Sequence, residues 1–228
     1  MSLAGDAVVV VWNGIAPEGR DAFYDWHVHE HMPERVGIPG FLRGRRYIAE
    51  RGEPEFFTLY EAASIEVLDG QDYQNRLNNP TPWTLSTVPH FRDVSRAIQR
   101  VRHSSGPGMG GHLLTVRLEA EDPDAFFAAS AQRVLAPLMA FKGVCGAHLC
   151  QTDLRASAVV TAEKKARKGD TGVPGWTLMV ETARREVADK VSELLLTDAG
   201  LRACGADGAG IAGLYRLEYV RTKSTTTA

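Results

Sequence analysis

Cysteine is scarce in this sequence, and the few cysteines present have no recognisable spacing. Three of them, Cys145, Cys150 and Cys204, stand among 228 residues. An odd number without a C-x-x-C pair predicts neither a disulfide framework nor a zinc site. Because such cysteines are typical of proteins kept in a reducing compartment, we expect a cytoplasmic protein.

Long apolar runs and an excess of charge of either sign are also missing. No run approaches the roughly 18 apolar residues of a membrane span, and no signal peptide opens the chain. The 26 basic and 28 acidic residues give a net charge of −2. Since no basic stripe is present, the attraction to phosphates that dominates nucleic-acid binding would be weak. We therefore expect a small-molecule ligand and no nucleic-acid or membrane partner; a homodimer of the chain remains an open alternative.

What the chain does have is a hydrophobic fraction of 44%, which suffices for a large core. Its apolar patterns predict two similar series of elements. The first series has strands at residues 7–12, 41–49, 56–62 and 94–102 and helices at 17–32 and 66–77. The second has strands at 114–118, 144–152, 176–182 and 215–219 and helices at 123–140 and 186–201. Each series has the order βαββαβ, which is the ferredoxin-like order of an α+β fold.

The chain divides into two repeats joined by a linker. The Gly-Pro-Gly-Met-Gly-Gly segment at residues 106–111 is the clearest linker in the sequence. It separates a first ferredoxin-like repeat, residues 1–105, from a second, residues 112–228. The second repeat is longer, which places an insertion at about residues 155–175. Since that segment is rich in Lys, Gly and Ala, we predict a protruding, mobile hairpin tip there.

Direct alignment of the two repeats supports a tandem duplication. The Asp-Ala-Phe sequence at residues 21–23 recurs at residues 124–126. Further along, and at a larger offset because of the insertion, Thr58-Leu59 aligns with Thr177-Leu178. A repeated series of this length predicts two structurally equivalent units.

The strongest candidate for a site is the histidine-rich stretch at residues 26–34, Trp-His-Val-His-Glu-His-Met-Pro-Glu. On a regular helix, Phe23, His27 and His31 share one face, and His29 lies opposite in solvent. Because imidazoles titrate near pH ~6.5, His27 and His31 are candidate catalytic acids or bases. Two other interpretations remain open: core histidines with hydrogen-bond partners, or metal ligands at i and i+4 that still need a third ligand.

The second repeat supplies an internal comparison for this stretch. In the alignment His27 corresponds to Ser130 and His31 to Val134. Since a valine there is an ordinary core residue, His31 should also point inward, where an imidazole without partners costs about 1–3 kcal/mol. We therefore expect the first repeat to carry the site and the second to act as scaffold.

Side chains on the neighbouring strands are candidate substrate-binding groups. Arg45 and Tyr47 share a face of one strand, and Tyr60 lies on the next. An arginine fork or a phenol hydroxyl can bind a phenol or a carboxylate. We expect the His31 ring to reach a pocket formed by the first helix and the strands that carry Arg45 and Tyr60.

Trp26, His31 and Pro33 form a W-x4-H-x-P pattern at the end of the first helix, which Pro33 is expected to terminate. Ile38-Pro39-Gly40 then leads into a strand. This pattern resembles the EthD-like branch of the dimeric α/β-barrel superfamily. The resemblance implies two ferredoxin-like units paired sheet to sheet into a barrel with helices outside, here within one chain. It adds Trp26 to the substrate-binding candidates and makes His31 the residue with chemistry.

The superfamily includes cofactor-free oxygenases of aromatic polyketides, small-molecule cyclases and isomerases, and haem enzymes. The resemblance thus implies a fold and a pocket but no particular reaction. Our leading interpretation is a small-molecule enzyme of this kind, which acts on a hydrophobic aromatic or polyketide-like compound without a tightly bound cofactor. His31 would be its general acid or base, with His27 beside it. The alternatives are a non-catalytic small-molecule-binding protein and a haem- or metal-dependent enzyme that uses both histidines.

Overall fold

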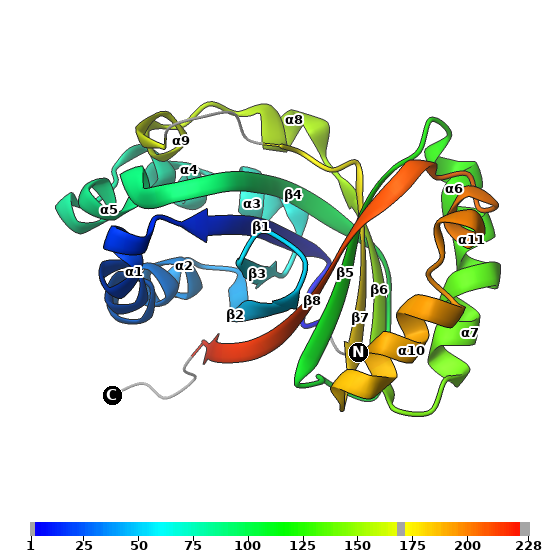
Figure 1. Cartoon of the computed structure of the whole chain (residues 1–228). Coiled ribbons are helices and arrows are strands. Elements are labelled where there is room, and N and C mark those ends of the chain that lie inside the picture. The colour runs from blue at the N-terminus through cyan, green and yellow to red at the C-terminus, as the bar shows by residue number, and fades with distance from the viewer. Residues whose placement is uncertain (1–2, 168–171, 224–228) are drawn as a thin grey trace.

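Eight strands close into one antiparallel barrel in the computed structural model, which describes residues 3–167 and 172–223 (Figure 1). Around the barrel the strands follow the order β1-β3-β2-β8-β5-β7-β6-β4. The helices lie outside the barrel, in two groups on opposite sides (Figure 1). No helix within these two ranges is both long and apolar enough to cross a membrane.

Each half of the chain supplies four strands to the barrel. They are β1 (Ala7–Ile15), β2 (Phe41–Arg51), β3 (Phe56–Ala62) and β4 (Phe91–Ser105), then β5 (His112–Glu119), β6 (Val144–Thr152), β7 (Trp176–Thr182) and β8 (Asp207–Thr222). Both sheets have the same topology, and they join at both edges, where β2 pairs with β8 and β4 with β6. The predicted α+β fold, with two ferredoxin-like repeats in a dimeric-α/β-barrel arrangement, is confirmed. The two sheets are hydrogen-bonded into one continuous wall.

Helices connect the strands and cover the outer face of this wall. In the first half they are η1 (Pro17–Gly19), α1 (Arg20–Trp26), η2 (His27–His31), α2 (Met32–Gly37), α3 (Ile65–Asp69), α4 (Gln71–Asn78), α5 (Pro82–Thr87) and η3 (Val88–His90). In the second half they are α6 (Pro123–Ser130), η4 (Ala131–Leu135), α7 (Ala136–Ala140), α8 (Leu154–Ala158), α9 (Ala162–Ala166), α10 (Arg185–Leu194) and α11 (Asp198–Arg202). The helices predicted at 66–77 and 186–201 are each divided in two.

Apolar packing differs between the two halves. The second half packs its helices on the sheet through one continuous apolar cluster. The first half has two separate clusters, one that includes Tyr60 and one that includes Phe23. His27 and His31 are buried in the same helix–sheet interface. A polar site can therefore form in the first half, whereas the second is a conventional core.

The structural correspondence between the residues of β3 and those of β7 differs by one residue from the correspondence that the sequence comparison predicted. Both strands have seven residues, so Tyr60 is equivalent to Val180. Both side chains pack under the outer helices. The sequence alignment matched Leu59 with Leu178 instead. Because successive side chains of a strand face opposite sides, that error exchanged the inner and outer faces of the barrel.

The insertion of the second repeat is not a protruding hairpin tip. Its described part contains α8 and α9, which pack on the first half, against β4 and against α4 and α5 respectively. Glu163 of α9 is buried there in an ion pair with Arg35. This partner lies far away in the sequence, so composition could not reveal it, and the prediction was wrong for the described residues of the insertion. Residues 168–171 lie outside the described ranges.

The first helical segment continues past Pro33, which the sequence predicted to end it. Residues His27–His31 form a π-helical turn, and α2 follows with Pro33 in its first turn. A proline donates no backbone hydrogen bond, and the wider turn before it relieves the clash with the preceding carbonyl. The second half has the same π-helical turn at Ala131–Leu135, again just before a proline. The turn therefore belongs to the fold rather than to the site.

Candidate functional site

The segment α1–η2–α2 places its histidines against the sheet of the first half. Phe23, His27 and His31 share one face, with ring centroids 5.2 Å apart for Phe23 and His27 and 5.7 Å apart for His27 and His31. His27 is 3% exposed and His31 is 7% exposed, whereas His29 lies in solvent. The face predicted from helical periodicity is thus the buried one.

Trp26 packs directly on the ring of His31. Their ring centroids lie 4.1 Å apart, with the planes inclined by 33°. Residues five apart diverge in a regular α-helix, but the π-helical turn between them brings these two to the same side. The indole Nε1–H donates to Oγ1 of Thr84 in α5 at 3.2 Å, which holds the ring in place. The W-x4-H spacing therefore has a geometric reason: the indole forms a wall beside the imidazole.

A small cavity lies at this pair of rings, with a volume of about 30 Å³. Its walls are Val11, Asn13, Phe23, Trp26, His27, His31, Thr58, Tyr60, Phe91 and Arg167. Space of this size accommodates about one to three water-sized groups. It therefore holds a head group of a ligand, and a complete aromatic ring requires a wall to move.

Both cavity histidines are neutral at physiological pH. Burial lowers the pKa of His31 well below its ordinary value, and the positive charge of Arg35 adds to this effect. Burial also lowers the pKa of His27, with Arg46 as the next cause. A neutral imidazole has one acceptor nitrogen and one donor N–H. Each ring can therefore accept a hydrogen bond from a ligand, and its lowered pKa makes it a weaker base than a free imidazole.

Two residues of the cavity carry buried polar atoms that have no hydrogen-bond partner among the described residues. They are Nδ1 of His31 and the hydroxyl oxygen of Tyr60. The two rings lie 6.2 Å apart, centroid to centroid. Burial raises the pKa of Tyr60, so its hydroxyl stays protonated and can donate. Such unsatisfied groups cost about 1–3 kcal/mol each, which favours a ligand that would satisfy them.

Arg46, rather than Arg45, faces the helix that carries the histidines. Nη1 of Arg46 lies 3.4 Å from Nδ1 of His27, and its Nε pairs with Glu218 at 3.3 Å. Arg45 and Tyr47 instead pack in the interior of the barrel. The prediction that they line the pocket was wrong. Side chains alternate along a strand, and the sequence pattern of this one did not show which face meets the helix.

Inside the barrel, Arg45 belongs to a buried ion network that joins the two halves. Its Nε lies 2.9 Å from Glu61 and its Nη1 lies 3.0 Å from Glu181. His148 occupies in β6 the place of Arg45 in β2, and its Nε2 lies 3.4 Å from Glu181. All four side chains are fully buried. We assign this network to the fold, because it fixes one sheet against the other.

Three charged residues beside the cavity were missed in the sequence: Arg35, Glu163 and Arg167. Glu163 in α9 accepts hydrogen bonds from both arginines, and Arg167 also lines the cavity. Burial would raise the pKa of the Glu163 carboxyl, but the attraction of the two arginines lowers it. Alignment of the repeats could have revealed Arg35, because the offset used for the histidines places it on Leu138. The other two lie in the insertion and have no counterpart.

The equivalent face of the second half is almost entirely apolar. In place of His27, His31, Arg35 and Tyr60 it has, in that order, Ser130, Val134, Leu138 and Val180. All four of these replacements are buried. The duplicated chain therefore has one polar site of this kind within its described residues, and it lies in the first half.

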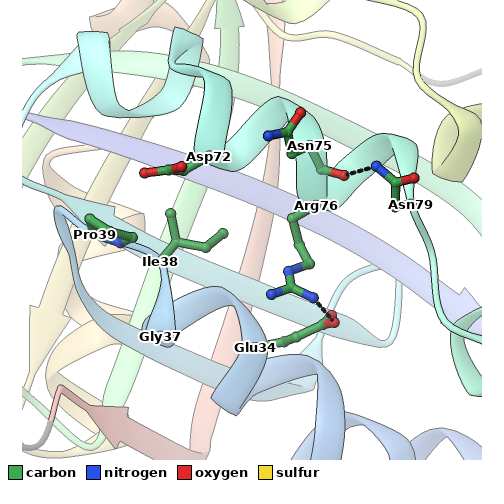
Figure 2. Close-up of a pocket in the computed structure, with 8 residues that line it drawn as sticks. All are labelled: Glu34, Gly37, Ile38, Pro39, Asp72, Asn75, Arg76 and Asn79. Atoms are coloured by element: carbon green, nitrogen blue, oxygen red, sulfur yellow. Dashed lines mark hydrogen bonds and ion pairs between the residues drawn. The ribbon is translucent and has the colours of Figure 1, made fainter.

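A larger groove lies on the surface between α2 and α4 (Figure 2). It has a volume of about 500 Å³ and is lined by Glu34, Gly37, Ile38, Pro39, Asp72, Asn75, Arg76 and Asn79. Figure 2 shows Arg76 reaching across it to Glu34, to whose Oε1 it donates at 2.9 Å. The groove offers space but no imidazole or thiol. Its Glu34 also lies 3.6 Å from Arg35, so it borders the charged residues of the site.

Metal ligation needs more side chains than the histidine pair provides. Within residues 3–167 and 172–223, no group of three or more His, Cys, Asp or Glu side chains is placed to hold a metal ion. His27 and His31 therefore have no third ligand in this part of the chain.

Comparison with known proteins identifies the fold. No family model and no curated sequence matches the chain. An anthrone oxidase-like protein of known structure superposes with a TM-score of 0.62 at 12% identity, covering 97% of this chain and 95% of that one. A proposed monooxygenase from Fusobacterium nucleatum gives 0.58 at 10% identity, covering 97% and 96%. A proposed chlorite dismutase gives 0.51 at 11% identity, covering 94% and 96%.

At these identities the similarity shows the fold alone. The chain has the fold of the dimeric α/β-barrel proteins, with both ferredoxin-like units in one polypeptide. The fold that the resemblance of the W-x4-H-x-P pattern implied is confirmed.

Proposed function

We propose that this chain is a small-molecule enzyme that acts on a hydrophobic aromatic or polyketide-like compound, with His31 as general acid or base. The observation that carries the proposal is the neutral, buried imidazole of His31, whose Nδ1 has no partner among the described residues. The second half keeps a valine at that place, so the fold itself does not need the histidine. The anthrone oxidase-like and monooxygenase names of similar structures support a small-molecule role.

The side chains of the cavity fit a proton-transfer step. Trp26 offers a flat apolar surface for a ring, and the Tyr60 hydroxyl donates to a ligand oxygen. His31 accepts a proton from the ligand and returns it to the product. His27, whose ring lies 5.7 Å from that of His31, supplies a second neutral imidazole. No tightly bound cofactor enters this step.

A ligand with an aromatic ring requires more space than the cavity of about 30 Å³. Phe91 and Arg167 form one wall, where the guanidinium carbon lies 5.5 Å from the ring centroid. We expect these two side chains to separate when a ligand binds. The residues present do not fit haem, since a macrocycle is far larger than the cavity and would have to displace several walls.

A non-catalytic binding protein is the second candidate function. The same unpartnered atoms of His31 and Tyr60 would then hold a metabolite without changing it. The two functions differ in one observable, which is the appearance of product after binding.

The test uses His31→Val, with His29→Val as its matched control on the exposed side of the same turn. Binding of 1-naphthol is measured by fluorescence, product formation in air by mass spectrometry, and folding by the melting temperature. We expect His31→Val to lose at least tenfold in affinity or turnover while its melting temperature stays the same or rises, because an unsatisfied polar group is removed. His29→Val should behave as the wild type.

Three outcomes separate the possibilities. Product formation that requires His31 supports the enzyme. Binding of 1-naphthol that requires His31 without any product supports the binding protein. A lower melting temperature of His31→Val with unchanged affinity would make the histidine structural and overturn both.

A further inference from the structure

We propose that the cavity beside His31 binds one negatively charged oxygen of its ligand, held by Arg167 and the Tyr60 hydroxyl with Arg35 behind them. The ligand is thus a carboxylate, or a phenol or enol bound as its anion. This inference rests on the proposed function in one respect, namely that the cavity takes a small molecule, and it adds the charge of that molecule.

The first argument is the balance of buried charge beside the cavity. Arg35 and Arg167 share a single buried carboxylate, that of Glu163. The next carboxylate, Glu34, lies 3.6 Å from Arg35 and is shared with Arg76. The positive charges of Arg35, Arg76 and Arg167 therefore outnumber the negative charges of Glu34 and Glu163, and both cavity histidines are neutral. An anion would compensate the remaining positive charge.

The second argument is the type of polar atom that is left unpaired. Besides the Tyr60 hydroxyl and Nδ1 of His31, the buried Nε of Arg167 makes no hydrogen bond within the described residues, whereas Nη1 of Arg35 lies 3.6 Å from Oε2 of Glu34. Nε of Arg167 and the tyrosine hydroxyl, both on cavity residues, are donors. Donors gathered without acceptors favour an oxygen atom that carries negative charge.

The third argument is size. The cavity of about 30 Å³ holds about one to three water-sized groups. A carboxylate or a single phenolate oxygen fits this space, with the apolar remainder of the ligand against Phe91 and Trp26. The side chain of Arg167 is 10% exposed, so its interaction with an anion would be weakly screened by solvent.

An anion at this position would also act on His31. Burial is the main cause that lowers the pKa of His31 in the free protein, and the charges of Arg35 and Arg167 add to it. A negatively charged ligand oxygen would offset the contribution of these two cations. His31 could then hold the proton that the ligand has released. When a phenol binds, its O–H bond breaks, the electron pair stays on oxygen and the proton moves to a ring nitrogen of His31. No oxidant or co-reactant is needed for that step.

The decisive residue comes from the insertion of the second repeat. Arg167 lies just after α9 and is held by Glu163, four residues before it. The first repeat has no residue equivalent to Arg167, since the segment that carries Arg167 is an insertion in the second repeat. The charge preference of the site is thus set by an element that the duplicated ferredoxin-like unit does not contain.

The experiment follows the histidine ring signals by nuclear magnetic resonance in the full-length protein. The probes are formate and formamide, which have similar size and differ in charge. His31→Val identifies the His31 signal among the seven histidines. We expect formate to shift this signal saturably and formamide at equal concentration to leave it in place. Equal effects of both probes, or no saturable shift with formate, would overturn the proposal.

Arg167→Gln tests the role assigned to the arginine. Loss of a charge-assisted hydrogen bond should weaken formate binding by about tenfold or more. Lys165→Gln, which removes an exposed charge on α9 two residues before Arg167, is the matched control and should not change affinity. If Arg167→Gln unfolds the chain, Tyr60→Phe removes the other donor assigned to the anion and leaves the ion pairs of Glu163 intact. A folded variant of either kind with wild-type affinity for formate would contradict the inference.

Aromatic probes show which source supplies the anion. Benzoate is compared with benzamide, and 4-nitrophenol with 4-nitroanisole, whose oxygen cannot ionise. The optical spectrum of bound 4-nitrophenol reports directly whether it is present as the anion. Tighter binding of either acidic member supports the anion site. If the neutral member of each pair binds His31-dependently and equally well, the anion inference fails while the proposed function stands.

Discussion

His27 and His31 lie where a charged imidazole is disfavoured, and this has a consequence for the individual residues. Burial lowers the pKa of both rings in the folded state. In the unfolded chain the same rings titrate near pH ~6.5. Below that pH the unfolded state binds protons that the folded state does not, so acid shifts the equilibrium toward unfolding.

We therefore predict that the free energy of unfolding falls as the pH decreases from about 6.5 toward the folded-state pKa values. Each of the two histidines contributes a slope of up to about 1.4 kcal/mol per pH unit in that window. Urea denaturation at pH 7, 6 and 5 measures the effect. Carboxylates such as Glu163, whose pKa is lowered in the folded state, act at lower pH and do not obscure it.

The double variant His27→Ser/His31→Val, which copies the second repeat, is the control for this prediction. Its unfolding free energy should change less between pH 7 and pH 5 than that of the wild type. His103, whose pKa is also lowered by burial, contributes equally to both proteins. Parallel pH profiles would show that the two imidazoles are not neutral in the folded state.

At the scale of the element, α9 depends on one buried carboxylate. Glu163 neutralises Arg35 and Arg167, and removing one partner of a buried ion pair leaves charges without compensation. We predict that Glu163→Gln lowers the free energy of unfolding by about 3–5 kcal/mol. Glu186→Gln, on the exposed side of α10, should change it by less than about 0.5 kcal/mol.

The same variant should loosen α9 locally. Trypsin can cut after Lys164 and Lys165 only when this short helix opens. Cleavage there should be slow in the wild type and several-fold faster in Glu163→Gln, followed by peptide mass spectrometry. Equal cleavage rates in the two proteins would show that the ion pair does not hold the helix on the first half.

Sequence reasoning predicted the elements with strong periodicity and missed those fixed by distant partners. β6 and β7 have the predicted bounds, because their alternating patterns end at turns. The insertion was misinterpreted because its order comes from a carboxylate that binds an arginine in the other repeat. The alignment of β3 with β7 was off by one residue, since adjacent positions in both strands are apolar or small.

The candidate site was predicted in part for similar reasons. The helical period showed that His27 and His31 share a buried face, and the resemblance added Trp26. Arg45 was assigned to the wrong face of its strand, because the sequence does not show which side of β2 meets a helix. Arg167 could not be predicted at all, since nothing local in the insertion indicates that it reaches the cavity of the first repeat.

At the scale of the whole molecule, the two repeats complete each other. β2 pairs with β8 and β4 with β6, and the ion network of Arg45, Glu61 and Glu181 crosses between them. Separate fragments of residues 1–105 and 112–228 would each expose two unpaired edges and one apolar face. We predict that neither fragment is a folded monomer and that mixing them restores the amide spectrum of the intact chain. A cooperatively folded, monomeric 1–105 fragment would contradict this.

The presence of one polar site on a nearly two-fold symmetric barrel has a consequence for binding measurements. Two identical ferredoxin-like units would offer two equivalent pockets, and occupancy of one could influence the other. Here Val134 and Leu138 fill the second position, so the described part of each chain forms one pocket of this kind. Titration with 1-naphthol should give one ligand per chain, a hyperbolic isotherm and a Hill coefficient of one. Because the first half carries this pocket and the equivalent place in the second half is filled, we expect no cooperative binding between the two halves of one barrel.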